Sequence, residues 1–253
     1  MISKNKQKFI KSLGLKKHRD AEHLFIAEGP KVVEDLMGHY PCVILAGTSE
    51  YLALHPHFKS QETYEITEKE LKQISQLKSP RDVIAVFSQQ KANKTDMMPD
   101  FQNNLVLVLD DIQDPGNLGT IIRIADWYGI HHIICSLHSA DAFSPKVVQA
   151  TMGALSRINI TYTSITELFS KINKSLPRYG TFLDGHDIYS TKITKNGIIV
   201  MGNEGNGITK DVAKYITHRL YLPNYPKGVE TSESLNVAVA TAITCAEFRR
   251  RMS

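Results

Sequence analysis

Three loops in the second half of the chain place polar side chains among glycines, at the ends of apolar runs typical of strands. They are Asp110–Arg123, Met201–Thr209 and Leu220–Val237. In open parallel α/β sheets, ligands bind beyond the carboxyl ends of the strands, where such loops lead into helix N-termini. We therefore expect the chemistry of this protein to lie in these three loops.

The first loop reads DDIQDPGNLGTIIR. Pro115 and Gly116 force a tight path, and Asn117 is predicted to cap the following helix by accepting backbone N–H groups. Arg123 lies off the apolar stripe of that helix, either as an ordinary surface arginine or with its guanidinium against a phosphate or a ribose hydroxyl. The loop contains neither G-x-G-x-x-G nor G-x-x-x-x-G-K-[ST], which argues against a classical dinucleotide or nucleoside triphosphate site.

The second and third loops contribute one acid and two small polar residues. In MGNEGNGIT, three glycines let a ligand approach the backbone around Glu204, although a plain tight turn explains them too. Thr209 is predicted to cap the helix that follows this loop. In the third loop, Ser234 is predicted to cap a closing helix over Leu235–Arg250. Taken singly, Ser234 and Asn236 need no other explanation than capping.

The spacing of apolar residues predicts a parallel α/β domain around these loops. Leu105–Leu109 is a continuous apolar run typical of a buried parallel strand. A helix over Leu118–Tyr128 follows from apolar residues at helical spacing, and Gly129 ends it. Further strands are predicted at His132–Cys135, Ile158–Thr161, Gly180–Leu183 and Ile198–Met201, with a strand end at Leu220–Leu222.

In the first half of the chain, short apolar runs alternate with helical patterns, which predicts a smaller α/β domain. Its strands and helices are expected at His23–Ala27, Pro30–Met37, Cys42–Ala46, Thr63–Ile66, Glu68–Gln76 and Val83–Phe87. The polar stretch Lys91–Asn104 has no periodicity and is predicted to hold a linker. Residues 1–19 hold seven basic side chains and no acid, which suits either a solvated helix or the binding of a phosphate backbone.

The composition is that of a globular protein and excludes several classes. The chain has 253 residues, 42% of them apolar and 22% charged, with a formal net charge of +4. No apolar run approaches the ~20 residues that span a bilayer, and no hydrophobic stretch follows the N-terminal lysines as in a secretory signal. The three cysteines lie too far apart for a disulfide framework or a metal-ligand pattern. We expect a cytoplasmic protein without membrane contact.

Two groups of residues that could suggest a metal ion have simpler explanations. His131 and His132 are adjacent, so on a strand their side chains point to opposite faces. Asp110, Asp111 and Asp114 are explained by loop solvation and helix capping. We expect no metal site.

Taken together, N-L-G-T-I-I-R, G-N-E-G and S-L-N-V-A-V-A-T resemble the three motifs of the SpoU (TrmH-type) RNA ribose methyltransferases. The stretch HRDAEHLFIAEGPKVVEDL resembles the accessory substrate-binding domain of that family, a ribosomal-protein-like RNA-binding fold. The resemblance implies an RNA substrate-binding domain over residues 1–95, a linker over 96–104 and a methyltransferase domain with a trefoil knot over 105–253. It further implies a homodimer formed through the C-terminal domain, and transfer of a methyl group from S-adenosylmethionine to a ribose 2′-hydroxyl of rRNA or tRNA.

The resemblance also implies site residues. The catalytic positions of the motifs match Asn117, Arg123, Glu204, Ser234 and Asn236. The cofactor positions match three residues that act through backbone groups and apolar contact: Gly202, Leu222 and Leu235. In the basic N-terminal stretch we expect RNA contacts from Lys16, Lys17 and Arg19. The path Asn224–Glu233 is longer than is usual in related sequences, which leaves the shape of the cofactor lid open.

The role of Arg123 remains open between two mechanisms. An arginine side chain is protonated at neutral pH, so it serves as a base only if a dry, cationic site removes its proton. Alternatively, it stays charged and stabilises a developing alkoxide or clamps the neighbouring phosphate. Two other functions are compatible with an α/β protein of this kind: an RNA-binding assembly factor without catalysis, and a nicotinamide-dependent oxidoreductase. The motif residues argue against the first, and the missing glycine fingerprint argues against the second. We expect rRNA rather than tRNA as substrate because the accessory domain is present.

Overall fold

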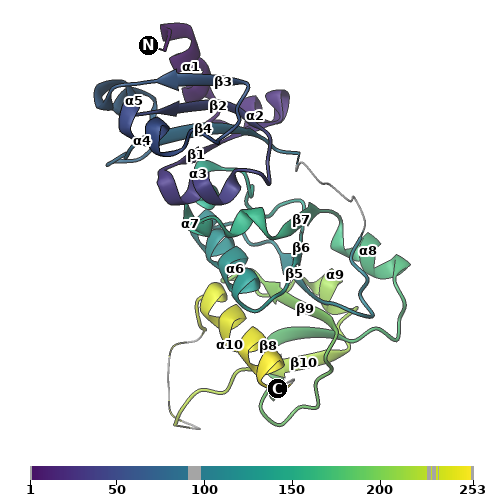
Figure 1. Ribbon diagram of the computed structural model, residues 1–253. Helices are drawn as coiled ribbons and strands as arrows, with labels where there is room; N and C mark the ends of the chain where they lie inside the picture. The colour runs from purple at the N-terminus through teal and green to yellow at the C-terminus, as the bar shows by residue number, and fades with distance from the viewer. Residues whose placement is uncertain (1, 91–97, 227–228, 230–231, 233, 252–253) are drawn as a thin grey trace. The chain divides into compact units, whose positions relative to one another are not determined.

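The computed structural model in Figure 1 describes residues 2–90, 98–226, 229, 232 and 234–251. The chain forms two units, Met1–Asp96 with Asp141–Ser156, and Met97–Ala140 with Arg157–Ser253. Asp141–Ser156 therefore packs with the N-terminal unit, although the sequence suggested a C-terminal domain continuous over residues 105–253. Residues 91–97, which include the start of the predicted linker, lie outside the described residues.

The N-terminal unit is built on a four-stranded sheet in the order β1-β4-β2-β3. Its elements are α1 (Lys4–Ser12), α2 (Lys16–Glu22), β1 (Leu24–Glu28), α3 (Pro30–Leu36), β2 (Cys42–Gly47), α4 (Ser49–Leu54), β3 (Glu62–Glu65), α5 (Glu68–Ile74), β4 (Val83–Ser88), α7 (Pro145–Thr151) and the 3₁₀ turn η1 (Ala154–Ser156). The pairs β1–β4 and β2–β4 are antiparallel, and β2–β3 is parallel. The strands and helices predicted between residues 23 and 87 are confirmed within a few residues, whereas α4 was missed and the basic stretch forms two helices, α1 and α2, in place of one.

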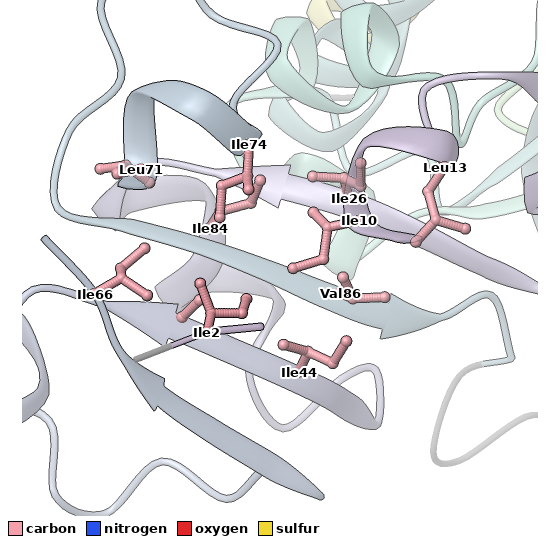
Figure 2. Packing of buried hydrophobic residues seen from close by; sticks show 11 residues of the cluster. Ile2, Ile10, Leu13, Ile26, Ile44, Ile66, Leu71, Ile74, Ile84 and Val86 are labelled. Atoms are coloured by element: carbon pink, nitrogen blue, oxygen red, sulfur yellow. The ribbon is translucent and has the colours of Figure 1, made fainter. Parts of the chain in front are cut away.

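Figure 2 shows how one face of this sheet is covered: side chains of α1 and α5 point towards those of the strands. Ile10 and Leu13, which belong to the basic N-terminal stretch, are fully buried there. The opposite face carries Phe25, whose ring packs against Tyr40 at 5.2 Å and Phe143 at 4.9 Å between centroids. Phe143 comes from the segment Asp141–Ser156, so this segment supplies part of the core of the unit.

The C-terminal unit is built on a six-stranded sheet in the order β10-β8-β9-β5-β6-β7, in which every pair is parallel. Its elements are β5 (Leu105–Asp110), α6 (Pro115–Trp127), β6 (His132–Cys135), β7 (Asn159–Tyr162), α8 (Ile165–Lys171), β8 (Arg178–Asp187), β9 (Gly197–Gly202), α9 (Lys210–Ala213), β10 (His218–Tyr221) and α10 (Val237–Arg250). The predicted parallel α/β fold is confirmed. The strand order reverses between β5 and β9, which is where such sheets bind ligands.

Helices cover both faces of this sheet. On one face, α8 and α9 pack on alternate residues of the strands, including Val108 and Val200. On the other face, α6 and α10 lie side by side (Figure 1). Of these four helices, α8 was missed by the sequence analysis. No helix within the described residues is long and apolar enough to cross a membrane.

Candidate active site

The carboxyl end of β5 leads into α6 through a turn that differs from the prediction in one respect. Asp114, and not Asn117, is the N-cap, because its carboxylate accepts a hydrogen bond from the backbone N–H of Asn117 at 2.8 Å. Pro115 then occupies the first helical position, where its missing N–H costs nothing. The side chain of Asn117 is thereby left available for other contacts.

Asn117, Glu204 and Asn236, one from each predicted loop, bond directly to one another. Nδ2 of Asn117 donates to Oε1 of Glu204 at 2.7 Å. Nδ2 of Asn236 donates to the same oxygen at 2.6 Å and to Oδ1 of Asn117 at 2.9 Å. These residues lie 87 and 32 positions apart in the chain. We call this arrangement the amide–carboxylate network; it joins the three loops at the carboxyl edge of the sheet.

Asn236 is held in place by its own helix. It is the N-cap of α10, and its Oδ1 accepts the backbone N–H groups of Ala238 at 3.0 Å and Val239 at 3.3 Å. The prediction that Ser234 caps this helix is wrong, because the chain becomes helical only at Val237 and the cap must directly precede it. With Oδ1 occupied by the cap, Nδ2 of Asn236 points to Glu204.

Two helices begin at this edge and are joined at both ends. At their N-termini, Asn117 of α6 bonds to the cap of α10. At their C-termini, Arg249 donates to the carbonyl oxygens of Tyr128 at 2.7 Å and Gly129 at 2.9 Å. The two helices therefore run parallel. Both present their partly positive N-termini to the amide–carboxylate network, and this favours negative charge there.

Arg123 does not take part in the amide–carboxylate network. It is exposed, and it forms no hydrogen bond or ion pair with the residues that the structure describes. It follows Asn117 by six residues, which on a helix corresponds to about 240° around the axis, so the two side chains leave α6 in different directions. Thr120 and Trp127 share the face of Arg123 by their spacing, and Trp127 is 84% exposed.

The residues expected to hold a cofactor lie at the same edge of the sheet. Gly202 ends β9, and a side chain there would place its Cβ 2.2 Å from the backbone of Gly207 and Ile208, because the loop folds back over this position. Leu222 follows β10 and is half-buried. Leu235 directly precedes the cap of α10 and is 50% exposed. A half-buried and an exposed leucine beside polar loops suit a ligand with an apolar ring, so the residues present fit such a group.

Ser234 belongs to the third loop, of which the structure describes only some residues. Ser234 is exposed, two residues before Asn236. In Asn224–Glu233, residues 227, 228, 230, 231 and 233 lie outside the described residues, and these include every charged residue of the stretch.

The structure separates the three residues predicted to bind RNA. Lys17 is exposed, and Lys16 forms a surface ion pair with Asp20 at 2.8 Å. Arg19 is only 3% exposed, and its guanidinium donates to Asp141 at 2.7 Å and to the carbonyl oxygens of Leu13 and Gly14. The prediction for Arg19 is therefore wrong, since a buried guanidinium that makes four hydrogen bonds to three partners inside the protein is not accessible to a phosphate.

Other groups of residues are not arranged for chemistry. Within the described residues, no cluster of three or more His, Cys, Asp or Glu side chains could hold a metal ion. Burial raises the pKa of the Cys135 and Cys245 thiols to about 12, so neither is a nucleophile near neutral pH. A cavity of about 600 Å³ opens at the opposite, amino edge of the sheet beside Phe101, Ile172 and Asn196, and it contains none of the motif residues.

Helix capping, one of the two explanations expected for the aspartates of the first loop, holds for Asp114. Asn203, which lies beside Glu204, was given no role from the sequence. Its contacts join two loops 92 residues apart, and no local pattern indicates such a pairing.

Comparison with known proteins agrees with this geometry. Residues 104–246 match the model of the SpoU rRNA Methylase family, and residues 4–85 match the MRM3-like substrate binding domain. The chain is 27% identical to the 23S rRNA (guanosine(2553)-2′-O)-methyltransferase RlmP of Bacillus subtilis, over 96% of both chains. A TrmH-family structure from Porphyromonas gingivalis is 41% identical, with a TM-score of 0.89 over 99% of both chains.

A second solved structure was determined with a ligand. The AdoMet-bound rRNA methyltransferase of Sinorhizobium meliloti is 31% identical to this chain and has a TM-score of 0.85, covering 100% of this chain and 97% of its own. The match to the family model extends over more than half of the chain and contains all three loops of the amide–carboxylate network. The chain belongs to the SpoU rRNA methylase family.

Proposed function

We propose that this protein transfers a methyl group from S-adenosylmethionine to a ribose 2′-hydroxyl of ribosomal RNA. The observation that supports this most directly is the amide–carboxylate network, in which Asn117, Glu204 and Asn236 meet from three distant loops. Beyond the capping of α10 by Asn236, bonds among one half-buried and two exposed side chains contribute little to folding, whereas a reaction that depends on positioning needs such an arrangement.

Gly202, Leu222 and Leu235 hold the cofactor in this proposal. The leucines contact the adenine ring, and the backbone at the end of β9 supplies polar contacts. When bound, S-adenosylmethionine supplies a methyl group activated by a sulfonium sulfur. The protein must then hold the ribose oxygen in line with that methyl group and exclude competing water.

The amide–carboxylate network and Arg123 act on the acceptor sugar. A ribose hydroxyl becomes a good nucleophile only as its proton leaves, so the site needs an acceptor for that proton or a cation that stabilises the oxygen. Glu204 and the two asparagines orient the RNA, and Ser234 forms part of the third wall. Arg123, which bonds to none of the described residues, acts as the base or as the electrostatic clamp.

The N-terminal unit selects the RNA. Its match to a substrate-binding domain, and the similarity of the whole chain to a 23S rRNA methyltransferase, favour rRNA over tRNA. Lys16 and Lys17 contact phosphates, together with the exposed lysines of α1, Lys4, Lys8 and Lys11. Arg19 has a structural role.

Three further properties complete the proposal. The C-terminal chain is threaded in a trefoil knot, as the resemblance to the family implies, and the protein acts in the cytoplasm. Two copies associate through the C-terminal unit. Trp127 on α6 and Val239 on α10, which are 84% and 48% exposed, support a dimer because they leave apolar surface on two neighbouring helices.

The test measures transfer of labelled methyl groups from S-adenosylmethionine to RNA isolated from cells that lack the gene. We expect label in rRNA, recovered as a 2′-O-methylated nucleoside, and none in rRNA from cells that carry the gene, because their site is already methylated. Label in tRNA alone would contradict the substrate. Absence of label from both RNAs, under conditions where the protein binds the cofactor, would contradict catalysis.

A further inference from the structure

We propose that Asn203 is a positioning residue, which fixes the loop of Glu204 against the loop that leads to Asn117. The proposal rests on the proposed methyl transfer. Nothing in the motif comparison gave this residue a role.

The side chain of Asn203 joins the two loops. Its Nδ2 donates to the carbonyl oxygen of Asp111 at 2.9 Å. Its Oδ1 accepts the backbone N–H groups of Gly205 at 2.9 Å and Asn206 at 3.2 Å. The orientation of the amide is unambiguous, since one end meets only an acceptor and the other only donors.

The backbone of Asn203 closes the loop on itself. Its N–H donates to the carbonyl oxygen of Gly207 at 3.0 Å, and its carbonyl oxygen accepts the N–H of Gly207 at 2.8 Å. Glu204 is therefore the first residue of a short turn that is held by backbone bonds across its base and by Oδ1 of Asn203 inside it. The direction of the Glu204 side chain follows from this turn.

The partner of Asn203 is a constrained residue. Asp111 has a φ of 61°, in the left-handed region that few non-glycine residues adopt. Its N–H donates to the hydroxyl of Ser136 at 2.9 Å, and its carbonyl oxygen accepts from Asn203. Asp111 is thus held on both sides in a conformation that the chain does not favour by itself, and it sets the path towards α6.

A second bond anchors the far end of the Glu204 loop to the same strand. The buried carboxylate of Asp110, 4% exposed, accepts the backbone N–H of Thr209 at 2.7 Å. The loop from Asn203 to Thr209 is therefore attached at both ends to the end of β5. Of the two attachments, only that of Asn203 lies beside Glu204, so its loss should displace Glu204 relative to Asn117.

The opposite edge of the sheet offers a matched control. Nδ2 of Asn196 donates to the carbonyl oxygen of Gln102 at 2.7 Å and joins the turns that precede β9 and β5. The residue type, the kind of bond and the two strands are the same, but this bond lies at the amino edge. Asn196→Ala therefore removes the equivalent of the bond from Asn203 to Asp111 without touching the site, whereas Asn203→Ala also removes the acceptor for Gly205 and Asn206.

The experiment compares methyl transfer by the wild type, Asn203→Ala, Asn203→Asp and Asn196→Ala, with thermal unfolding of each. We expect Asn203→Ala to lower kcat by about 10- to 100-fold, while KM for RNA and for S-adenosylmethionine stays within about threefold. Asn203→Asp keeps the acceptor for Gly205 and Asn206 but loses the donor to Asp111. It should also lower kcat, since the proposal depends on the bond between the loops.

The outcomes separate this proposal from the proposed function. If the wild type transfers no methyl group to RNA, the proposed function fails and these variants are not needed to show it. With an active wild type, a kcat of Asn203→Asp and Asn203→Ala within about twofold of normal would overturn the positioning role. An equal loss of kcat in Asn196→Ala would do the same, because the effect would then be one of stability.

Discussion

The two edges of the C-terminal sheet use side-chain amides in different ways. At the amino edge, Asn196 bonds to the backbone of Gln102, and Asn103 bonds to the side chain of Asp100 within its own turn. At the carboxyl edge, Asn117, Glu204 and Asn236 come from three loops and bond to each other, side chain to side chain.

The difference lies in the bonds between side chains of distant loops. A bond from a side-chain amide to a backbone carbonyl occurs at both edges, from Asn196 to Gln102 and from Asn203 to Asp111, and needs only one ordered side chain. The bonds among Asn117, Glu204 and Asn236 order one half-buried and two exposed side chains for little net stability beyond the capping of α10. Their effect is to fix functional atoms relative to one another, and the following variants test the two edges against each other.

The largest effect on turnover is expected from Arg123→Ala. The guanidinium is exposed and forms no bond with the described residues, so its removal should leave the fold intact and lower kcat by about 10³-fold or more. Binding of S-adenosylmethionine, measured by calorimetry, should persist. Lys195→Ala removes a cation at the amino edge and should be neutral. Near-normal turnover of Arg123→Ala would contradict both proposed roles.

The next effect is expected at the two ends of β9. In Gly202→Ala, the new Cβ meets the backbone of Gly207 and Ile208 at 2.2 Å, so the loop must move, and we expect kcat to fall by about 100-fold. In Gly197→Ala, the new Cβ meets the carbonyl oxygen of Pro177 at 2.8 Å. The backbone of Gly197 also has a φ of 130°, which an alanine rarely adopts. Both variants should unfold at lower temperature, but only the first should lose turnover. Equal losses of turnover would remove the distinction between the edges.

A smaller effect is expected from neutralising one carboxylate at each edge. Glu204→Gln retains an oxygen that accepts from Asn117 and Asn236 but removes the charge, and we expect kcat to fall by about 10-fold. The matched variant is Asp100→Asn, where hydrogen bonds, chiefly from Asn103, hold the pKa of the carboxyl below its usual value. Asp100→Asn should leave kcat unchanged. Full activity of Glu204→Gln would show that the charge has no role.

No effect on turnover is expected from Glu247→Gln, because Glu247 lies at the C-terminal end of α10, far from Asn236. Glu247 is 4% exposed and accepts from Arg250 at 2.8 Å and Arg251 at 2.5 Å. Arg251 also donates to the carbonyl oxygens of Ile188 and Tyr189 after β8. Loss of the charge should therefore cost about 1–3 kcal/mol in the free energy of unfolding.

The pH dependence of that cost has a definite sign. In the folded state, hydrogen bonds from Arg250 and, to a smaller extent, Arg251 lower the pKa of Glu247 below its ordinary value of 4.5. The stabilisation by the carboxylate is fully present above the unfolded value and is lost as the pH falls through the lower, folded value. Thermal unfolding of the wild type and Glu247→Gln from about pH 6 to pH 3 should show a difference that shrinks on acidification. A difference that grows would contradict the assignment.

Much of the fold could be predicted because its signals are local. The buried strands of the C-terminal sheet are continuous apolar runs, and Leu105–Leu109 differs from β5 by a single residue. Helix starts were less certain, because Asn117 and Ser234 are good caps by type, yet Asp114 and Asn236 hold those positions. Several residue types can cap, and the geometry of the turn selects among them.

The sequence predicted which residues form the site but not how they contact one another. The three motifs contain Asn117, Glu204 and Asn236, whereas the hydrogen bonds among these residues depend on how the loops meet in the folded chain. Arg19 illustrates the reverse error. Its basic neighbours suggested RNA, but its partner Asp141 lies 122 residues further along, and burial follows from that distant carboxylate.

The segment Asp141–Ser156 has a consequence for how this protein can be divided. The match of residues 4–85 to a substrate-binding domain suggests a domain that could be separated from the rest of the chain. Its core, however, includes Phe143, and its buried Arg19 is paired with Asp141, and both residues come from a segment that follows β5 and β6 in the sequence. A fragment ending at residue 96 would expose the ring of Phe25 and leave a buried cation without its counter-charge. We therefore expect an exchange of the N-terminal unit between related proteins to give a folded product only if residues 1–96 and Asp141–Ser156 are exchanged together.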